Sequence, residues 1–140
     1  RLMPLARVIT PNIPEAEILA GCSISGEDVF DEIARKLSGN TGVSVLLKAG
    51  HLSGDSLVDY FYNAEDGSMT KLPSKRVHTR NTHGTGCTLS SALAAALAKG
   101  EDLTAAAVSA KKYIEQAIIS GADYEIGGGH GPVNHFWSMG

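Results

Sequence analysis

The sequence lacks long apolar runs and clusters of charge of one sign, and it holds only two cysteines. Its formal net charge is -3, and no run of basic residues is longer than the pair Lys111-Lys112. This argues against a nucleic-acid partner, which would require a basic face. No segment approaches the roughly 20 apolar residues of a membrane-spanning helix. The first residues also lack a charged region followed by an apolar stretch and a cleavage site, so we expect a cytoplasmic protein with no membrane partner.

The cysteines and histidines form no disulfide or metal-binding pattern. A disulfide between Cys22 and Cys87 would be unexpected in a reducing compartment. Cys22 is expected at a helix-to-loop junction, as a buried or inert thiol. The Gly-Pro pair between His130 and His135 prevents these two side chains from sharing a helical face, so we predict no zinc site.

The composition is that of a folded protein. With 140 residues, 43% of them hydrophobic and 19% charged, the chain can bury a core in a single globular domain. Residues 6–10 and 43–47 are predicted strands, and the second run is nearly continuous in apolar residues, as in a strand covered on both faces. Between them, Ser25 and Asp28 give a start signal for a helix whose apolar face spans residues 29–37. This alternation predicts a parallel sheet with right-handed crossovers, and hence an α/β sandwich.

Further elements are expected after the second strand. Residues 57–62 and 69–72 flank an Asp-Gly turn and predict a hairpin. Residues 77–79 are expected to form a last short strand. Residues 103–118 have the apolar spacing of a long amphipathic helix, which can pack closely on the other small-residue helix of the chain.

The tail, residues 121–140, is predicted to be an irregular or flexible loop. Its run Gly127-Gly128-Gly129 resembles a phosphate cradle only superficially, because Pro132 interrupts any helix that could follow. No internal repeat or low-complexity linker is present.

The segment Asn81-Thr82-His83-Gly84-Thr85-Gly86-Cys87-Thr88 joins a glycine-rich loop directly to an apolar helix. Gly84 and Gly86 allow the backbone to approach a ligand closely. The helix supplies unpaired N–H groups and the positive end of a dipole. Such a site suits an anion, and phosphate above all.

Cys87 is expected in the first turn of this helix. Apolar residues recur on one helical face from Leu89 to Leu97, and Gly100 predicts the end of the helix. The helix dipole can stabilise a thiolate in the first turn. The alternative is that a small, frequently buried residue packs beneath the turn and has no chemical role.

Asn12 and Glu15 follow the first predicted strand, and Lys48 follows the second. An Asn with Glu three residues later is a capping box, which stabilises a helix start without any catalytic role. In open α/β sheets, ligands bind beyond the carboxyl ends of the strands, where Lys48 could meet a phosphate. An ordinary solvated lysine is the alternative.

Two common phosphate motifs do not fit the glycine loop. The P-loop requires Lys and then Ser or Thr after its last glycine, and the Rossmann fingerprint requires a glycine where Leu89 stands. The loop instead resembles the Asp-Thr-x-Gly-Ala-Gly-Asp signature of the ribokinase-like (PfkB) sugar and vitamin kinases. Its Cys-ended form, continued by Thr88-Leu89-Ser90-Ser91-Ala92, is similar to that of the hydroxymethylpyrimidine/phosphomethylpyrimidine kinases.

The resemblance extends along essentially the whole chain. Residues 10–17 resemble the family's Asn-x-x-Glu region, residues 47–51 its Lys-Gly-Gly-His segment, and residues 129–136 its C-terminal tail. Asn81 stands where many members of the superfamily have Asp, and Cys87 stands where most use an Asp base. The cysteine points to the pyrimidine kinase branch, although some pyridoxal kinases share it.

The resemblance implies a ribokinase-like α/β fold, which is a three-layer α/β/α sandwich with a mostly parallel central sheet. Residues 1–140 would be a single domain, the C-terminal, nucleotide-binding portion, because the family's N-terminal, pyrimidine-binding part has no counterpart here. The implied reaction is ATP- and Mg²⁺-dependent phosphorylation of 4-amino-5-hydroxymethyl-2-methylpyrimidine, and then of its monophosphate, in thiamine biosynthesis. We expect a homodimer or association with the missing portion, and no activity from the isolated fragment.

Roles for individual residues follow from the same resemblance. The catalytic residues would be Cys87, Gly84, Thr85 and Gly86. Loop N–H groups would hold the moving phosphoryl group, and the thiol would face the acceptor hydroxyl as base or orienting group. Glu15 would act on magnesium through water. The residues expected to bind ATP are Lys48, Asn12, Thr82 and Gly50. Two alternatives stay open: pyridoxal kinase activity, and a non-catalytic nucleotide- or phosphate-binding module.

Overall fold

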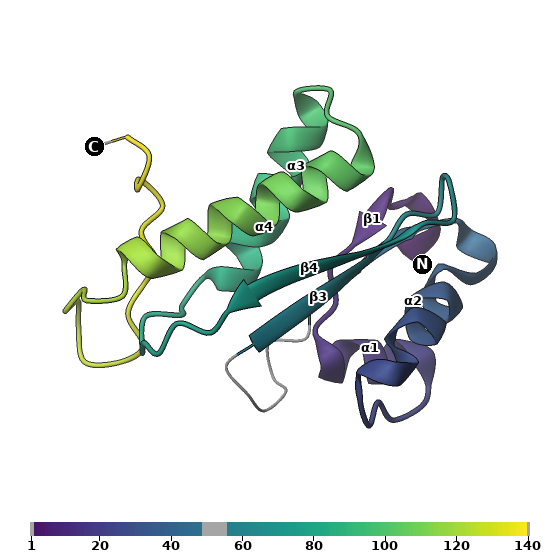
Figure 1. The fold of residues 1–140 in the computed structure, drawn as a ribbon, viewed down its shortest axis with the longest axis horizontal. Helices are drawn as coiled ribbons and strands as arrows, with labels where there is room; N and C mark the ends of the chain where they lie inside the picture. The colour runs from purple at the N-terminus through teal and green to yellow at the C-terminus, as the bar shows by residue number, and fades with distance from the viewer. Residues whose placement is uncertain (1, 49–55, 140) are drawn as a thin grey trace. The chain divides into compact units, whose positions relative to one another are not determined.

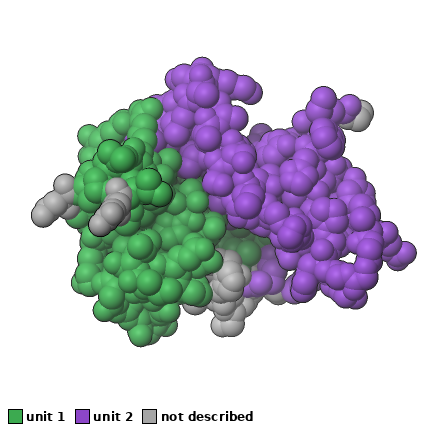
Figure 2. All heavy atoms as spheres, turned by 180° about the vertical axis from the view of Figure 1, so that it is seen from behind, with its two compact units in different colours: residues 1–75 green, residues 76–140 purple. Residues whose placement is uncertain are grey.

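The computed structural model describes residues 2–48 and 56–139. These residues form two compact units, Arg1–Lys75 and Arg76–Gly140, which Figure 2 draws in different colours. The single domain expected over residues 1–140 stays a prediction. None of the helices within the described ranges is long and apolar enough to cross a membrane.

The first unit is a four-stranded sheet with two helices. Its strands are β1 (Val8–Ile9), β2 (Ser44–Leu47), β3 (Ser56–Tyr62) and β4 (Met69–Lys75), and its helices are α1 (Ile13–Ala20) and α2 (Phe30–Ser38). The strand order is β1-β2-β3-β4, and Figure 1 labels β1, β3 and β4. β1 and β2 pair in parallel, as their connection through helices predicts, whereas β2, β3 and β4 pair in antiparallel fashion. The predicted β3–β4 hairpin is therefore confirmed, and the sheet of this unit is mixed.

Helix α2 does not begin as the sequence predicts. The chain enters it through a 3-10 turn (Glu27–Val29) whose N-cap is Gly26, and neither Ser25 nor Asp28 makes a capping hydrogen bond there. Gly26 has an extended backbone, and its missing side chain leaves the turn without a cap acceptor. The helix ends at Ser38 with Gly39 as its C-cap, so it contains the predicted apolar face from residue 30 onward.

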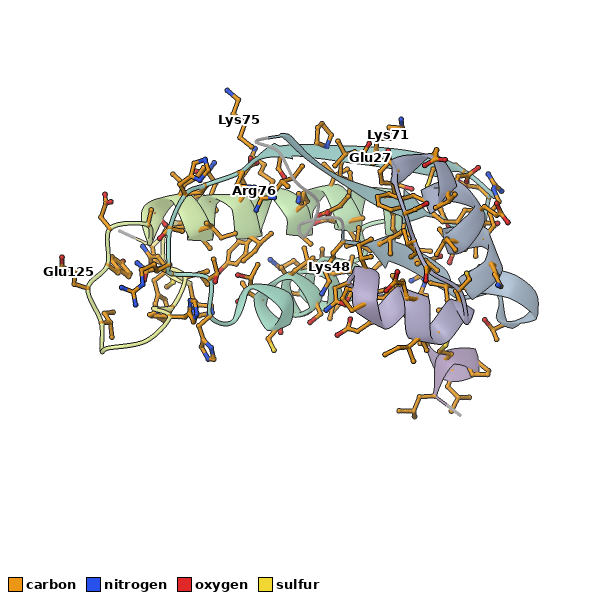
Figure 3. The ribbon with its side chains drawn as sticks, turned by 90° about the horizontal axis from the view of Figure 1, so that it is seen from below. Glu27, Lys48, Lys71, Lys75, Arg76 and Glu125 are labelled. Carbon is orange, nitrogen blue, oxygen red and sulfur yellow. The ribbon has the colours of Figure 1, made fainter. Side chains whose placement is uncertain are left out.

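The core of the first unit lies between α1, α2 and one face of the sheet. Val45 and Leu47 of β2 belong to one hydrophobic cluster with Phe30 of α2. All four residues of β2 are buried, as predicted for a strand covered on both faces. The Tyr60 ring meets the edge of the Phe30 ring, with 5.0 Å between the ring centroids, and the Tyr60 hydroxyl donates to Glu27 Oε2 at 3.1 Å (Glu27 is labelled in Figure 3).

The second unit consists of two helices and two irregular segments. Helix α3 (Thr85–Ala98) packs along α4 (Leu103–Ser120), as Figure 1 shows. Small residues at the contact, among them Ala96, Ala106 and Ala110, allow this close packing. Gly100 ends α3 as predicted: its φ is 91°, its N–H donates to Leu97 O, and the next N–H donates to Ala96 O.

The strand expected at residues 77–79 is absent, because the chain turns at Thr79 and the Thr79 side chain bonds to the tail. Thr79 N–H donates to Val77 O at 3.0 Å, which turns the chain, and Thr79 Oγ1 donates to Ala122 O at 2.8 Å. The tail is irregular, as expected, but it is fastened to α4. Asn134 N–H donates to Ala117 O at 2.9 Å, and Val133 is 2% exposed.

Candidate active site

The glycine loop folds into a tight turn at the start of α3. Gly84 is the N-cap with a φ of 85°, a left-handed conformation that favours glycine. Its carbonyl accepts the Thr88 N–H at 2.8 Å, the first bond of the helix. The Thr85 hydroxyl donates to Thr82 O at 2.6 Å and holds the preceding residues against the first turn.

Three backbone N–H groups of the turn are available to a ligand. The N–H groups of Gly84, Gly86 and Cys87 have no acceptor within the described part of the chain, whereas the Thr85 N–H donates to Thr82 O at 3.3 Å. No side chain caps this helix end. Unpaired N–H groups and the positive end of the helix dipole together form an anion-binding site.

Cys87 is exposed, and its position excludes the simple packing role. It is the third residue of α3, and it lines a cavity of about 530 Å³ together with residues of both helices and the tail. Four alanines line this cavity, and Tyr113 and His135 also line it. The thiol is therefore accessible from a cavity that begins beside the free N–H groups.

Asn81 fastens the loop to the tail from a buried position. Its side chain is 6% exposed, and its Nδ2 donates to the carbonyls of Gly121 at 2.8 Å, Ala122 at 3.1 Å and Tyr124 at 2.8 Å. His83 N–H donates to Gly131 O at 3.0 Å and adds a second link between loop and tail. A carboxylate could not donate to these carbonyls, which gives a physical reason for Asn at this position.

A cleft that the sequence did not predict lies beside the loop. An open cleft of about 1000 Å³ is lined by residues 76–82 on one side and residues 122–129 on the other. Arg76 and Glu125 both line it, and both are labelled in Figure 3. Gly127-Gly128-Gly129 belongs to this lining, so this glycine run is the sequence feature that could have indicated the cleft.

The predicted residues of the first unit also lie together. Asn12 Oδ1 accepts the Glu15 N–H at 2.8 Å, and Glu15 Oε2 accepts the Asn12 N–H at 2.9 Å, so the capping box is confirmed. Lys48, labelled in Figure 3, forms a parallel bridge with Asn12 and donates its N–H to Pro11 O at 2.9 Å. Gly50 lies outside the described residues.

Magnesium is compatible with the first unit through Glu15. Capping engages one of its carboxylate oxygens, which leaves the other for a hydrated cation. Within residues 2–48 and 56–139, no group of three or more His, Cys, Asp and Glu could hold a metal ion. A magnesium site with few protein ligands fits this chain, because Mg²⁺ commonly keeps several waters and binds through one or two carboxylates and substrate phosphates.

Comparison with known proteins identifies relatives of this chain. The family model of phosphomethylpyrimidine kinase matches residues 1–134. Hydroxymethylpyrimidine/phosphomethylpyrimidine kinase from Rhizobium meliloti is 46% identical over 138 residues, covering 96% of this chain and 50% of that protein. Thiamine biosynthesis bifunctional protein ThiED from Geobacter sulfurreducens is 47% identical over 135 residues, covering 96% of this chain and 27% of that protein. The chain thus spans half or less of the length of these relatives.

A solved structure shows the same fold. Pyridoxal kinase from Bacillus subtilis, in its ADP complex, superposes with a TM-score of 0.86 at 35% identity, covering 99% of this chain and 51% of that one. The ribokinase-like α/β fold predicted from the loop motif is confirmed for this portion. With the match over residues 1–134 and the identity to curated relatives, the chain belongs to the phosphomethylpyrimidine kinase family.

Proposed function

We propose that the protein transfers the γ-phosphoryl group of ATP to 4-amino-5-hydroxymethyl-2-methylpyrimidine and then to the resulting monophosphate, in thiamine diphosphate biosynthesis. One observation supports this above all. The exposed Cys87 thiol stands at the start of α3 among three N–H groups with no acceptor in the described chain, in a protein 46% identical to a kinase named for both steps.

The loop suits the electrostatic demands of phosphoryl transfer. Negative charge in the loose transition state lies on the equatorial phosphoryl oxygens, so positioning and charge stabilisation matter more than a strong base. The N–H groups of Gly84, Gly86 and Cys87 donate to these oxygens. The bond between the acceptor oxygen and phosphorus forms while the bond to the β-phosphate oxygen breaks, and ADP leaves.

Cys87 has different tasks in the two steps. In the first, its thiolate accepts the proton of the pyrimidine hydroxymethyl group, or the thiol orients that hydroxyl. In the second, the acceptor is already an anionic phosphate, which needs no deprotonation near neutral pH. A weak base at this position is therefore sufficient.

The remaining residues serve ATP and magnesium. The cavity between α3 and α4, which four alanines help to line, begins at Cys87 and suits the flat apolar faces of the adenine base. The family resemblance assigns Asn12, Lys48 and Thr82 to the phosphates of ATP, with Lys48 as a point cation. Magnesium, when bound, would neutralise charge on ATP oxygens. Glu15 would hold its hydration shell through the carboxylate oxygen that capping leaves open.

The acceptor pocket is assigned to polypeptide beyond this chain. The chain spans half of the Rhizobium meliloti relative, and the resemblance places the pyrimidine-binding segment in the other half. We therefore infer that turnover requires that portion, supplied in the same polypeptide or by a partner, including a second copy.

Coupled measurement of ATP turnover by the full-length protein tests this function. The two pyrimidine substrates and pyridoxal are compared side by side. Pyridoxal is included because of the 35% identity to a pyridoxal kinase structure. Turnover with both pyrimidines at higher kcat/KM than with pyridoxal is expected. A preference for pyridoxal would reassign the acceptor, and nucleotide binding without turnover of any of the three would favour a non-catalytic module.

A further inference from the structure

His135 connects the tail to both helices of the second unit. Its Nε2 lies 2.9 Å from Thr88 Oγ1 of α3, and its backbone carbonyl accepts the Tyr113 hydroxyl of α4 at 2.6 Å. The Trp137 ring lies 5.8 Å from the Tyr113 ring, centroid to centroid, so the following residues also pack against α4. One tail residue is therefore fixed from two helices, through its ring and through its backbone.

The ring of His135 is held at the Cys87 end of the cavity between α3 and α4. Thr88 is 7% exposed, follows Cys87 directly, and donates its N–H to Gly84 O in the glycine loop. The cavity extends from Cys87 in the first turn of α3 to Lys99 at its C-cap. His135 lines this cavity together with Cys87 and Tyr113, which places its imidazole near the end where phosphate would meet the loop.

The bond to Thr88 leaves one ring nitrogen for a ligand. Nε2 is engaged by the Thr88 hydroxyl, whereas Nδ1 has no partner among residues 2–48 and 56–139. The ring is exposed, although Thr88 Oγ1 and the tail backbone fix its position. A ring held in this way loses little conformational freedom when it contacts a ligand.

We propose that His135 is a positioning residue for the nucleotide: fixed by Thr88, it closes the cavity beside Cys87 and contacts the ribose and phosphate part of ATP. This role rests on the kinase function proposed above. It keeps the phosphate chain in register with the N–H groups of Gly84, Gly86 and Cys87, and it does not take part in proton transfer.

Kinetic analysis of the full-length protein separates this role from a structural one. His135→Ala should raise KM for ATP about fivefold, as expected for the loss of one hydrogen bond, while kcat and KM for the pyrimidine change less than about twofold. Thr88→Val should raise KM for ATP similarly, because the ring loses its anchor. KM for ATP of the double variant should be no higher than that of His135→Ala alone, since both substitutions remove the same contact between Thr88 and His135. His135→Gln, whose amide can replace Nε2, should recover most of the affinity.

His130→Ala is the matched control, because His130 is an exposed histidine of the same tail that does not line the cavity. It should leave KM for ATP unchanged, and thermal unfolding should show all variants folded. An unchanged KM for ATP in His135→Ala would overturn the positioning role. So would a double variant whose increase in KM for ATP equals the product of the increases in the two single variants. Failure of the parent protein to turn over ATP would instead overturn the proposed function, so the two failures are distinguishable.

Discussion

The side-chain amide of Asn81 occupies the space that a Cβ at Gly131 would need. Gly131 also accepts the His83 N–H, so the loop and the tail meet at this glycine through packing and through a hydrogen bond. The three carbonyls that Asn81 contacts lie 40 to 43 residues further along the chain. The position of the glycine loop therefore depends on this contact with the start of the tail.

Asn81→Asp should destabilise the protein by about 3 kcal/mol, because the carboxylate cannot donate, so Tyr124 O loses its donor and a buried negative charge faces three carbonyl oxygens. Asn134→Asp is the matched control: Asn134 Oδ1 accepts the Phe136 N–H, and a carboxylate can do the same. Urea unfolding of both variants measures the difference. Equal stability of the two variants would contradict the assigned role of Asn81.

The stability of the protein should fall in alkali because of Tyr60. Burial raises the pKa of Tyr60, and the hydrogen bond and negative charge of Glu27 raise it further. Above about pH 10 the unfolded chain loses this proton before the folded protein does, so the free energy of unfolding decreases as the pH rises. Tyr60→Phe should show a smaller decrease over the same interval. Urea unfolding at neutral and alkaline pH compares them, and parallel pH profiles would refute the assignment.

Two substitutions separate capping from magnesium binding at the start of α1. Glu15→Gln keeps an oxygen that can accept the Asn12 N–H, so stability should change little, whereas the Mg²⁺ concentration needed for half-maximal turnover should rise about tenfold. Asn12→Ala removes the cap acceptor and should cost about 1 kcal/mol of stability. Magnesium titrations and thermal unfolding measure both effects. An unchanged Mg²⁺ requirement in Glu15→Gln would leave Glu15 with the capping role alone.

Cys87→Ala should harm the first phosphorylation more than the second. Loss of a general base lowers a rate by about 100-fold, and only the hydroxyl acceptor requires deprotonation. Single-turnover rates of full-length protein with each pyrimidine measure the two steps separately. Equal losses in both steps would remove Cys87 from the role of base.

Local signals in the sequence predicted much of the fold. Asn12 and Glu15 cap α1, Gly100 ends α3, and the Asp-Gly turn forms the hairpin, because each rule involves neighbours within a few residues. The strand predicted at residues 77–79 is wrong, since Thr79 N–H donates to Val77 O and the Thr79 hydroxyl donates to the distant Ala122 O.

The chemistry of the site was only partly predictable. The motif indicated an anion site at the loop, and helix geometry accounts for its free N–H groups. The contacts of Asn81 and of His135 were not predictable, because their partners are distant in sequence and are brought together by tertiary packing.

We propose that the turn from Gly84 to Cys87 holds the phosphoryl group during transfer. The decisive experiment is a crystal structure of the full-length protein with Mg²⁺ and the ATP analogue AMP-PCP. We predict that the terminal phosphonate accepts hydrogen bonds from the N–H groups of Gly84, Gly86 and Cys87, with the adenine in the cavity between α3 and α4. A terminal phosphonate bound elsewhere, with these N–H groups facing solvent, would show that the turn does not hold the phosphoryl group.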